Sequence, residues 1–308
     1  MKNFINISDH SSNDLRAIID EAKARKLKRQ NLNKSAPDED KPFEGKSMAM
    51  IFEKPSTRTR MSFDIAVKQL GGSSIILNPD GIHYGKGDET LKDTAKVLTE
   101  YVDIVMLRTS SHKNLEEFGK HLDIPIINGL SDIGHPCQIM SDILTYEESN
   151  GTIEGKKVAW LGDGNNNMSN SLIEAAGKFK FNLSIACPKK YSPNKKILSW
   201  AKKNKVNLIV TTKPEEAVNK SDCVMTDKWV SMNDKVNKKA KKKILKPFQV
   251  NKKLMSKANS DAIFMHCLPV GRGEEVTDDV IDGKQSVVWR QALNRVHAQK
   301  SIIKWCLD

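Results

Sequence analysis

Short apolar runs alternate with amphipathic segments along most of the chain. Leu15, Ile18, Ile19 and Ala22 recur at the spacing of one helix face, which predicts a helix over 13–30. Strands of the buried type are predicted at 48–52, 74–78, 102–107, 124–127, 158–161, 183–186, 208–210, 223–225 and 262–265. Further helical segments are predicted at 90–101, after 138, around 172–179 and after 289. Strands that alternate with helices in this way predict an α/β fold with mostly parallel sheets flanked by helices.

A polar stretch, Ser149-Asn150-Gly151-Thr152, separates two such sets of elements and is predicted to be a hinge. We therefore expect two domains of similar size, residues 1–148 and residues 149–290. The chain of 308 residues is long enough for two medium domains.

The turn after the first predicted strand carries the most concentrated polar chemistry. Ser56-Thr57-Arg58-Thr59-Arg60 opens a predicted helix, so hydroxyls and arginines meet at a helix start. Backbone N–H groups there lack partners and the helix dipole attracts negative charge, which predicts a site for a phosphate or similar anion. The simpler interpretation is an N-cap hydroxyl with solvated arginines. Cations in the first turn oppose the dipole, however, unless an anion is bound.

Ligands of open parallel sheets bind beyond the carboxyl ends of the strands. Besides the turn, the side chains expected at these ends are Arg108, His135, Asn167, Asp227 and Cys267. His135 is either a structural hydrogen-bonding residue or a donor that polarises a carbonyl oxygen.

The pair His266-Cys267, at the end of a predicted strand, suggests a thiol nucleophile, a metal pair or a buried cysteine. Adjacent residues on a strand point to opposite faces, so a Cys–His dyad is not expected. Gly162-Asp163-Gly164 follows another strand, but Asn167 stands where a dinucleotide fingerprint has its third glycine. A nicotinamide cofactor is therefore disfavoured.

The net charge of +12 raises the alternative of a nucleic-acid-binding protein. Residues 189–257 hold twenty lysines, no arginine and five acids, with few aromatic side chains. Nucleic-acid sites favour arginine forks and aromatic platforms. We therefore expect no nucleic-acid partner and a solvated lysine-rich surface, in which 235–246 is an exposed insertion.

Five scattered cysteines without a CxxC pair argue against a disulfide framework or a zinc ribbon, which favours a reducing cytoplasm. No apolar run approaches the ~20 residues that span a bilayer, and the N-terminus has no apolar signal core. We expect a cytoplasmic protein without a membrane partner.

Four motifs occur in order along the chain. They are Ser56-Thr57-Arg58-Thr59-Arg60, His135-Pro136-Cys137-Gln138, Asp227-Lys228-Trp229-Val230-Ser231-Met232 and His266-Cys267-Leu268-Pro269. With these motifs the chain resembles the ornithine carbamoyltransferases over nearly its whole length. The first two motifs are shared with aspartate carbamoyltransferases, whereas the last two point to ornithine.

The resemblance implies a first domain that binds carbamoyl phosphate and a second that binds ornithine. It also implies that the C-terminal helix, 291–308, returns to the first domain. The implied enzyme needs no metal or organic cofactor and is a homotrimer with its sites at subunit interfaces. Its reaction moves the carbamoyl group to the δ-amine of L-ornithine and gives L-citrulline and phosphate, as in arginine biosynthesis.

The resemblance further implies roles for individual residues. Those implied to bind carbamoyl phosphate are Ser56, Thr57, Arg58, Thr59, His83, Arg108, His135, Gln138, Cys267, Leu268 and Arg295. Those implied to bind ornithine are Asn167, Asp227, Ser231 and Met232. The implied catalytic residues are Arg108, His135, Asp227 and Cys267. Arg60 is expected to support the turn, and Leu268-Pro269 to be a cis peptide.

Two positions depart from the family pattern. His83 stands where the family commonly has glutamine, and Asn233 stands where it has glycine. The second departure lies in the loop that defines the second substrate. An alternative is therefore a carbamoyltransferase of the same fold that acts on another amine, such as putrescine or an N-acylated ornithine.

Overall fold

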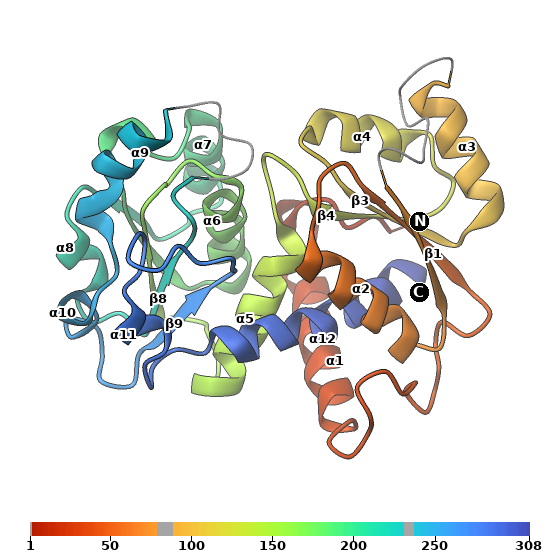
Figure 1. The fold of residues 1–308 in the computed structure, drawn as a ribbon, viewed down its shortest axis with the longest axis horizontal. Helices are drawn as coiled ribbons and strands as arrows, with labels where there is room; N and C mark the ends of the chain where they lie inside the picture. Colours follow the sequence, from red (N-terminus) through yellow and green to blue (C-terminus); the bar gives the residue numbers. More distant parts are fainter. Residues whose placement is uncertain (1, 79–88, 231–236) are drawn as a thin grey trace. The chain divides into compact units, whose positions relative to one another are not determined.

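A computed structural model describes residues 2–78, 89–230 and 237–308 of the chain (Figure 1). The chain forms two compact units, one of Met1–Ser141 with Leu293–Asp308 and one of Asp142–Ala292. Each unit has its own parallel sheet flanked by helices, so the predicted fold class is confirmed.

The first unit is built on a four-stranded parallel sheet in the order β2-β1-β3-β4. Its strands are β1 (Ser47–Phe52), β2 (Ser73–Leu77), β3 (Ile104–Arg108) and β4 (Ile126–Leu130). Its helices are η1 (Ile7–Asp9), α1 (Ser12–Leu27), α2 (Thr57–Gln69), α3 (Leu91–Tyr101) and α4 (His112–Lys120), with parts of α5 (Pro136–Asn150) and α12 (Val288–Leu307). The central strands β1 and β3 are buried almost throughout because their side chains are apolar on both faces, as in sheets covered by helices.

The C-terminal helix α12 packs on the first unit, as predicted. Lys26 of α1 donates to Asn294 Oδ1 at 2.7 Å, and Arg295 donates to Thr59 Oγ1 of α2 at 2.9 Å. Helix α12 therefore brings polar side chains from the end of the chain to a unit formed mainly by its beginning.

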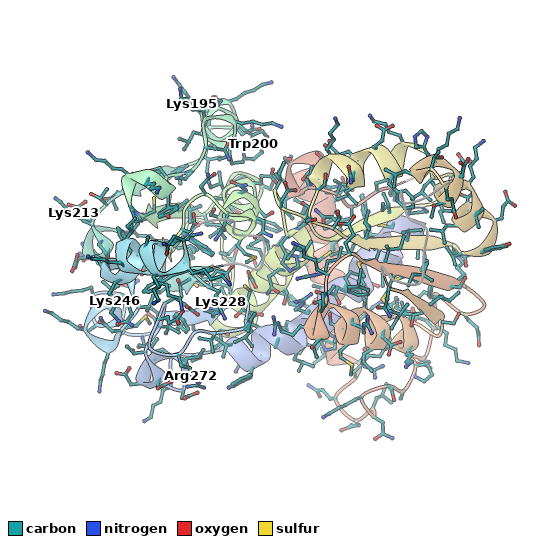
Figure 2. The ribbon with its side chains drawn as sticks, turned by 45° about the horizontal axis from the view of Figure 1, so that its top comes forward. Lys195, Trp200, Lys213, Lys228, Lys246 and Arg272 are labelled. Atoms are coloured by element: carbon teal, nitrogen blue, oxygen red, sulfur yellow. The ribbon has the colours of Figure 1, made fainter. Side chains whose placement is uncertain are left out.

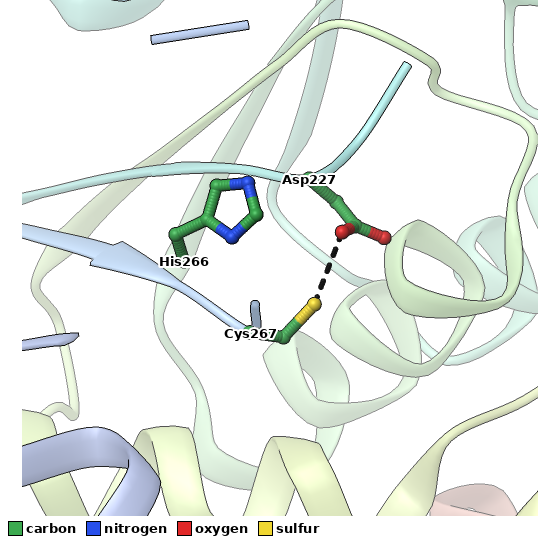
Figure 3. A group of neighbouring side chains, drawn as sticks. All are labelled: Asp227, His266 and Cys267. Carbon is green, nitrogen blue, oxygen red and sulfur yellow. Dashed lines mark hydrogen bonds between the residues drawn. The ribbon is translucent and has the colours of Figure 1, made fainter. Parts of the chain in front are cut away.

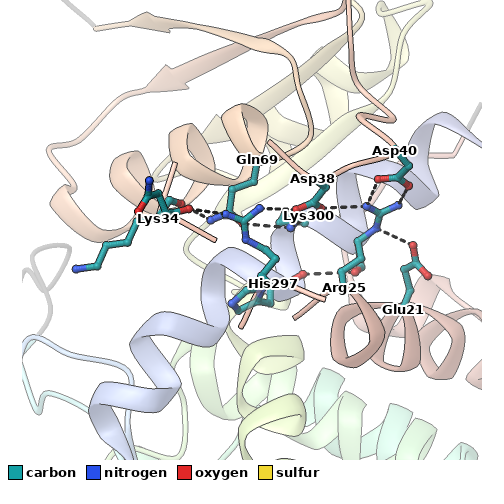
Figure 4. Close-up of polar contacts among 11 residues, drawn as sticks. Glu21, Arg25, Lys34, Asp38, Asp40, Gln69, His297 and Lys300 are labelled. Carbon is teal, nitrogen blue, oxygen red and sulfur yellow. Dashed lines mark hydrogen bonds and ion pairs between the residues drawn. The ribbon is translucent and has the colours of Figure 1, made fainter. Parts of the chain in front are cut away.

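A buried ion network joins α1, the loop that follows it and α12 (Figure 4). Asp38 accepts from Arg25 Nη1 at 3.0 Å, from Arg29 Nη1 at 2.5 Å and from Lys300 Nζ at 2.6 Å. Lys300 is fully buried and also donates to Gln69 Oε1, at the end of α2, at 3.1 Å. One carboxylate thus holds three cations in the interior, where a charge is costly unless it is paired.

His297, on α12 beside this network, makes the stability of the unit depend on pH. Burial, followed by the charges of Lys300, Lys26 and Arg29, lowers the pKa of His297 to about 3, with Asp38 opposing. Between about pH 3 and 6.5 only the unfolded chain takes up this proton. The free energy of unfolding therefore falls as the pH falls through this window, by up to about 1.4 kcal/mol per pH unit.

Replacing His297 by glutamine should remove this dependence. Urea unfolding at pH 6.5 and at pH 4.5 should show that the wild type loses roughly 2 kcal/mol more between the two conditions than His297→Gln does. Every other titrating group is common to the two proteins and cancels in the comparison. Equal losses in both proteins would mean that His297 is protonated in the folded chain, contrary to the prediction.

The second unit is built on a five-stranded parallel sheet in the order β7-β6-β5-β8-β9. Its strands are β5 (Lys157–Leu161), β6 (Asn182–Ala186), β7 (Leu208–Thr211), β8 (Cys223–Thr226) and β9 (Ile263–His266). Its further helices are α6 (Asn167–Phe179), η3 (Lys189–Tyr191), α7 (Lys195–Lys203), α8 (Pro214–Val218), α9 (Lys238–Leu245), η4 (Lys246–Phe248), α10 (Lys252–Met255) and α11 (Asp278–Ile281).

The lysine-rich stretch that was predicted to be an exposed insertion forms helix α9, which has two buried residues. Lys239 and Lys243 are exposed, but Lys241 is 5% exposed and Leu245 is fully buried. The prediction is wrong at these positions because a run of lysines has no apolar period that marks its buried members.

Other lysines of the second unit are exposed, as predicted. Figure 2 shows Lys195, Lys213 and Lys246 projecting from it. Exposed lysines with few aromatic neighbours form a solvated surface. Among the helices of the described residues, none is long and apolar enough to cross a membrane.

Candidate active site

Each sheet has a topological switch point, where connections leave one strand toward opposite sides. In the first unit β1 lies between β2 and β3, and in the second β5 lies between β6 and β8. Parallel sheets bind ligands beyond the carboxyl ends of the strands at such points. The residues at and after the ends of β1, β3, β5 and β8 are therefore candidate binding residues, and they include Ser56, Arg108, Asn167 and Asp227. Of the other predicted residues, His135 follows β4 and Cys267 follows β9.

Ser56 caps α2 at the switch point of the first unit. Its Oγ accepts the Thr59 N–H at 3.3 Å, so the N-cap interpretation is correct for this hydroxyl. Thr57, the first residue of the helix, is exposed. Arg58 follows with its Nε buried and without a hydrogen bond to any described residue. A buried guanidinium N–H at a helix start, where the dipole repels a cation, is suited to a bound anion.

Thr59 is fully buried and joins two arginines. Its Oγ1 accepts from Arg108 Nη1 at 3.1 Å and from Arg295 Nη2 at 2.9 Å. The sheet register explains part of this contact, because Phe52 at the end of β1 lies opposite Arg108 at the end of β3. Because Thr59 Oγ1 accepts these bonds, its own O–H is left to donate to a ligand.

His135 lies in the loop before α5, close to these arginines. Burial, followed by the charges of Arg295, Arg108 and Arg58, holds the pKa of His135 well below its usual value. The ring is therefore neutral near pH 7 and has one N–H to donate. Gln138 is 1% exposed, and its backbone N–H donates to the His135 carbonyl at 3.1 Å. The first unit thus brings together a turn suited to an anion and neutral hydrogen-bond donors.

Arg60 supports the turn, as predicted. Its guanidinium lies 5.3 Å from the centroid of the Phe52 ring and donates to Asn78 Oδ1. Arg60 is therefore engaged with β1 and with the end of β2.

In the second unit Asn167 and Asp227 follow the neighbouring strands β5 and β8. Asn167 is the first residue of α6, which is capped by Asn166, whose side chain accepts the Ser169 N–H at 2.8 Å. Asp227 is half-buried, and its Oδ1 accepts the Lys228 N–H at 2.7 Å. An amide and a carboxylate at the ends of adjacent strands suit the ammonium and carboxylate groups of an amino acid.

Cys267 is held against Asp227 by a thiol hydrogen bond. Its Sγ donates to Asp227 Oδ1 at 3.1 Å (Figure 3). Strand β9 ends at His266, so the alternation of side chains along a strand no longer governs Cys267. The ligand atoms of Asp227, His266 and Cys267 all lie within 4.8 Å of one another. The two side chains therefore do not point to opposite faces as expected. The Cys267 thiol bonds to Asp227, and the His266 nitrogens face Leu268 and Glu275, which agrees with the expectation that the pair is not a Cys–His dyad.

These three residues have the separation of a metal site, but His266 is already engaged. Its Nδ1 accepts the Leu268 N–H at 2.9 Å, and its Nε2 faces Glu275 Oε1 at 3.3 Å. With both ring nitrogens occupied, only a carboxylate and a thiol are left as donors, which is fewer than a zinc site uses. The sequence pattern gave no role to Glu275, which is fully buried and orients His266.

The Leu268-Pro269 peptide bond is cis, as predicted. Four further positions of interest, His83, Ser231, Met232 and Asn233, lie outside the described residues.

Polar side chains beyond the carboxyl ends of parallel strands are typical of α/β proteins that bind ligands at this edge of the sheet. Family models for the carbamoyl-P binding domain and the Asp/Orn binding domain of aspartate/ornithine carbamoyltransferase match residues 2–148 and 154–306. The chain therefore belongs to the aspartate/ornithine carbamoyltransferase family, as its motifs predict.

Relatives in this family are similar over their whole length. The ornithine carbamoyltransferase of Brucella ovis is 50% identical over 308 residues, which are 100% of this chain and 96% of the relative. A solved structure of ornithine carbamoyltransferase from Pyrococcus furiosus has a TM-score of 0.91 at 42% identity, covering 98% of this chain and 96% of that one. The anabolic enzyme from Campylobacter jejuni also has a TM-score of 0.91, at 36% identity, with 99% of each chain covered.

Proposed function

We propose that the chain transfers the carbamoyl group of carbamoyl phosphate to the δ-amine of L-ornithine, giving L-citrulline and phosphate. The observation that carries this proposal is the full-length match. Models of both domains of the family fit the chain, and relatives that are 50% identical over all 308 residues are named ornithine carbamoyltransferase.

The first unit supplies the groups that a dianionic phosphate and a carbonyl require. We assign the phosphate to the turn at the start of α2, with Arg108 reaching both phosphate and carbonyl oxygen. The full set assigned to carbamoyl phosphate in this unit is Ser56, Thr57, Arg58, Thr59, His83, Arg108, His135, Gln138 and Arg295. The buried Arg58 Nε and the charges that surround His135 support this assignment.

The second unit supplies the groups for ornithine. We assign Asn167, Asp227, Ser231 and Met232 to its amino-acid end. Cys267 and Leu268 are assigned to carbamoyl phosphate, and the Cys267–Asp227 hydrogen bond supports a shared role for these two residues near the amine.

In the proposed reaction the amine nitrogen attacks the carbonyl carbon. A C–N bond forms, the bond between the carbonyl carbon and the oxygen that bridges to phosphorus breaks, and phosphate leaves with the electron pair. The proton that the nitrogen loses on becoming the ureido nitrogen passes to the leaving phosphate. Negative charge that develops on the carbonyl oxygen is stabilised by Arg108, Thr59 and the neutral His135, which act as preorganised donors. The two bound substrates are also held in a reactive orientation, which can supply ~7–11 kcal/mol.

The attacking amine must first lose a proton, because its ordinary pKa is close to that of lysine, about 10.4. Asp227 and Cys267 are the residues assigned to orient the amine and accept this proton. The hydrogen bond from the Cys267 thiol to the Asp227 carboxylate supports a joint role for the two residues in this proton transfer.

An amine panel tests the proposed function. Purified protein is supplied with carbamoyl phosphate and L-ornithine, putrescine or an N-acylated ornithine, and the carbamoylated product is quantified. L-ornithine should have the highest kcat/KM. The alternative of another amine substrate is favoured by Asn233, which stands where the family has glycine. A higher kcat/KM for putrescine or an N-acylated ornithine would assign the chain to that substrate instead.

Arg58→Ala should weaken carbamoyl phosphate binding without unfolding the protein. Loss of a charge-assisted hydrogen bond costs about 1.5–3 kcal/mol, which corresponds to a rise in Kd of roughly 10- to 150-fold. Isothermal titration calorimetry measures Kd, and the thermal midpoint should stay near that of the wild type. Arg60→Ala is the matched control, because Arg60 contacts Phe52 and Asn78 and should leave Kd nearly unchanged. An unaltered Kd in Arg58→Ala contradicts the phosphate assignment.

We also propose that the enzyme is a cytoplasmic homotrimer of arginine biosynthesis. All five cysteines are free thiols, which suits a reducing compartment. One relative of known structure is named as an anabolic enzyme, which supports the biosynthetic role. Light scattering of the purified protein measures the number of subunits, and a number that is not a multiple of three contradicts the trimer.

A further inference from the structure

Lys241 and Asp163 form a buried ion pair in the second unit, and the proposed reaction gives neither residue a role. Lys241 Nζ lies 2.6 Å from Asp163 Oδ2, and the two side chains are 6% and 8% exposed. Lys241 belongs to α9, and its neighbours on that helix include the exposed Lys239 and Lys243. Lys241 is therefore buried among exposed lysines of the same helix, and it is paired with the Asp163 carboxylate. Burial of two charges costs desolvation free energy, and loss of either partner leaves the other charge buried and uncompensated.

Asp163 fixes the turn that leads into α6. Its Oδ1 accepts the Asn165 N–H at 2.9 Å, while its backbone carbonyl accepts the indole N–H of Trp160 at 3.0 Å. In the same turn Ser169 Oγ donates to the Gly164 carbonyl at 2.9 Å. Hydrogen bonds therefore join the loop at Asp163 to the first turn of helix α6, which contains Asn167.

The Lys241 ammonium also lies over Tyr191, which packs next to the segment that follows Asp227. Lys241 Nζ lies 5.1 Å from the centroid of the Tyr191 ring, within the range of a cation–π contact. Tyr191 packs against a buried cluster that contains Trp229, two residues after Asp227, and Leu245 at the end of α9. Lys241 thus contacts the turn before Asn167 directly, and it is linked through Tyr191 to the cluster next to Asp227.

The turn after β5 and the segment that contains Trp229 lie close together. A side chain at Gly162 would come within 3.3 Å of the Trp229 indole nitrogen, so the turn and the Trp229 segment are in near contact. Thr226 Oγ1, at the end of β8, donates to the Leu161 carbonyl at 2.8 Å, at the end of β5. The turn and the residues around the end of β8 are therefore joined by direct contacts.

We propose that Lys241 is a positioning residue for the amino-acid end of the amine substrate. Through Asp163 it sets where Asn167 stands relative to Asp227, and so determines how tightly an ammonium and carboxylate pair is held. This inference rests on the proposed function, because it takes the ligand of the second unit to be an amino acid that carries a second amine.

Steady-state kinetics of Lys241→Met tests the inference. The KM for ornithine should rise about 10-fold or more, because small misplacements of binding groups are costly. Both kcat and the KM for carbamoyl phosphate should stay within about 2-fold of the wild type, since Asp163 and Tyr191, which Lys241 contacts, are not assigned to that substrate. Lys239→Met is the matched control: the same substitution at an exposed site of the same helix should change none of the three constants.

Two further variants separate positioning from simple loss of folding. Lys241→Arg keeps the charge beside Asp163, so its KM for ornithine should be close to that of the wild type. The double variant Lys241→Met/Asp163→Asn leaves no unpaired buried charge, so it should recover thermal stability but keep the raised ornithine KM. If Lys241→Met does not fold, the double variant carries the same measurement.

The outcomes distinguish the inference from the proposed function. If the wild type makes no citrulline, the proposed function fails and the inference falls with it. If the wild type is active and the KM of Lys241→Met, or of the double variant, matches that of Lys239→Met, the inference alone is overturned. A rise of the ornithine KM that Lys241→Arg reverses supports it.

Discussion

Arg108→Ala should lower kcat by about 10²–10³-fold, the usual loss when one preorganised donor to a developing oxyanion is removed. Arg108 ends β3, and its Nη1 donates to Thr59 Oγ1 at 3.1 Å. It is also one of the three arginines whose charges help to hold His135 neutral. The variant removes a charge and two potential donors from the place where the carbonyl oxygen is proposed to lie.

The fold should tolerate this change. Thr59 keeps the hydrogen bond from Arg295 at 2.9 Å, and the Arg108 side chain is only half-buried. Removing a cation from a cluster of three also relieves repulsion among them. The thermal midpoint should therefore change by only a few degrees, about what a loss of 1 kcal/mol gives for a chain of this size.

Citrulline formation and thermal unfolding together test this prediction. Arg272→Ala is the control, because Arg272 is exposed and bonds to Asp278 and Asp282 in the second unit; its kcat should match that of the wild type. Arg108→Lys keeps the charge without the planar guanidinium, so its kcat should lie between those of the wild type and Arg108→Ala. A kcat within about 3-fold of wild type in Arg108→Ala would place the oxyanion donor elsewhere.

The strand, turn and helix around residues 48–70 were predictable because every signal for them is local. An apolar run, a hydroxyl cap and apolar residues at helical spacing follow one another, and the structure has β1 at Ser47–Phe52 and α2 at Thr57–Gln69. The same holds for the clustering of Arg108 and His135, because parallel strands bring their carboxyl ends to one edge.

Several short helices were not predicted because too few of their residues carry a pattern. Helix α4 buries only two large apolar side chains, Leu115 and Phe118, and α8 has five residues. Such helices are stabilised by packing on the sheet more than by their own sequence. Their positions therefore depend on the strands around them.

Ion partners could not be predicted because they are far apart along the chain and follow no period. Nothing local marks Lys241 as the buried member of its run, and its partner Asp163 precedes it by a whole set of strands and helices. Asp38 and Lys300 are still farther apart, in an early loop and in the last helix. Only the packed structure shows which charges are buried together. Loss of one of these buried charges is expected to reduce the stability of the protein most.

Asp38→Asn should therefore be among the most destabilising single changes in the first unit. The variant leaves Arg25, Arg29 and Lys300 buried around a neutral amide, and breaking a buried ion pair from one side costs about 3–5 kcal/mol. For a chain of this size that loss corresponds to a fall in the thermal midpoint of roughly 10 °C. Thermal unfolding measures the midpoint, and urea unfolding measures the free energy.

Asp40→Asn is the matched control for this change. Asp40 lies in the same loop and pairs with Arg25 at 2.5 Å, but its side chain is 56% exposed, so its loss should cost less than about 1 kcal/mol. The double variant Asp38→Asn/Lys300→Met removes a cation along with the carboxylate. It should be less destabilised than the sum of the two single variants, because each single change leaves an uncompensated buried charge. Equal losses in Asp38→Asn and Asp40→Asn, or strict additivity in the double variant, would mean that water reaches the network and that burial does not set its strength.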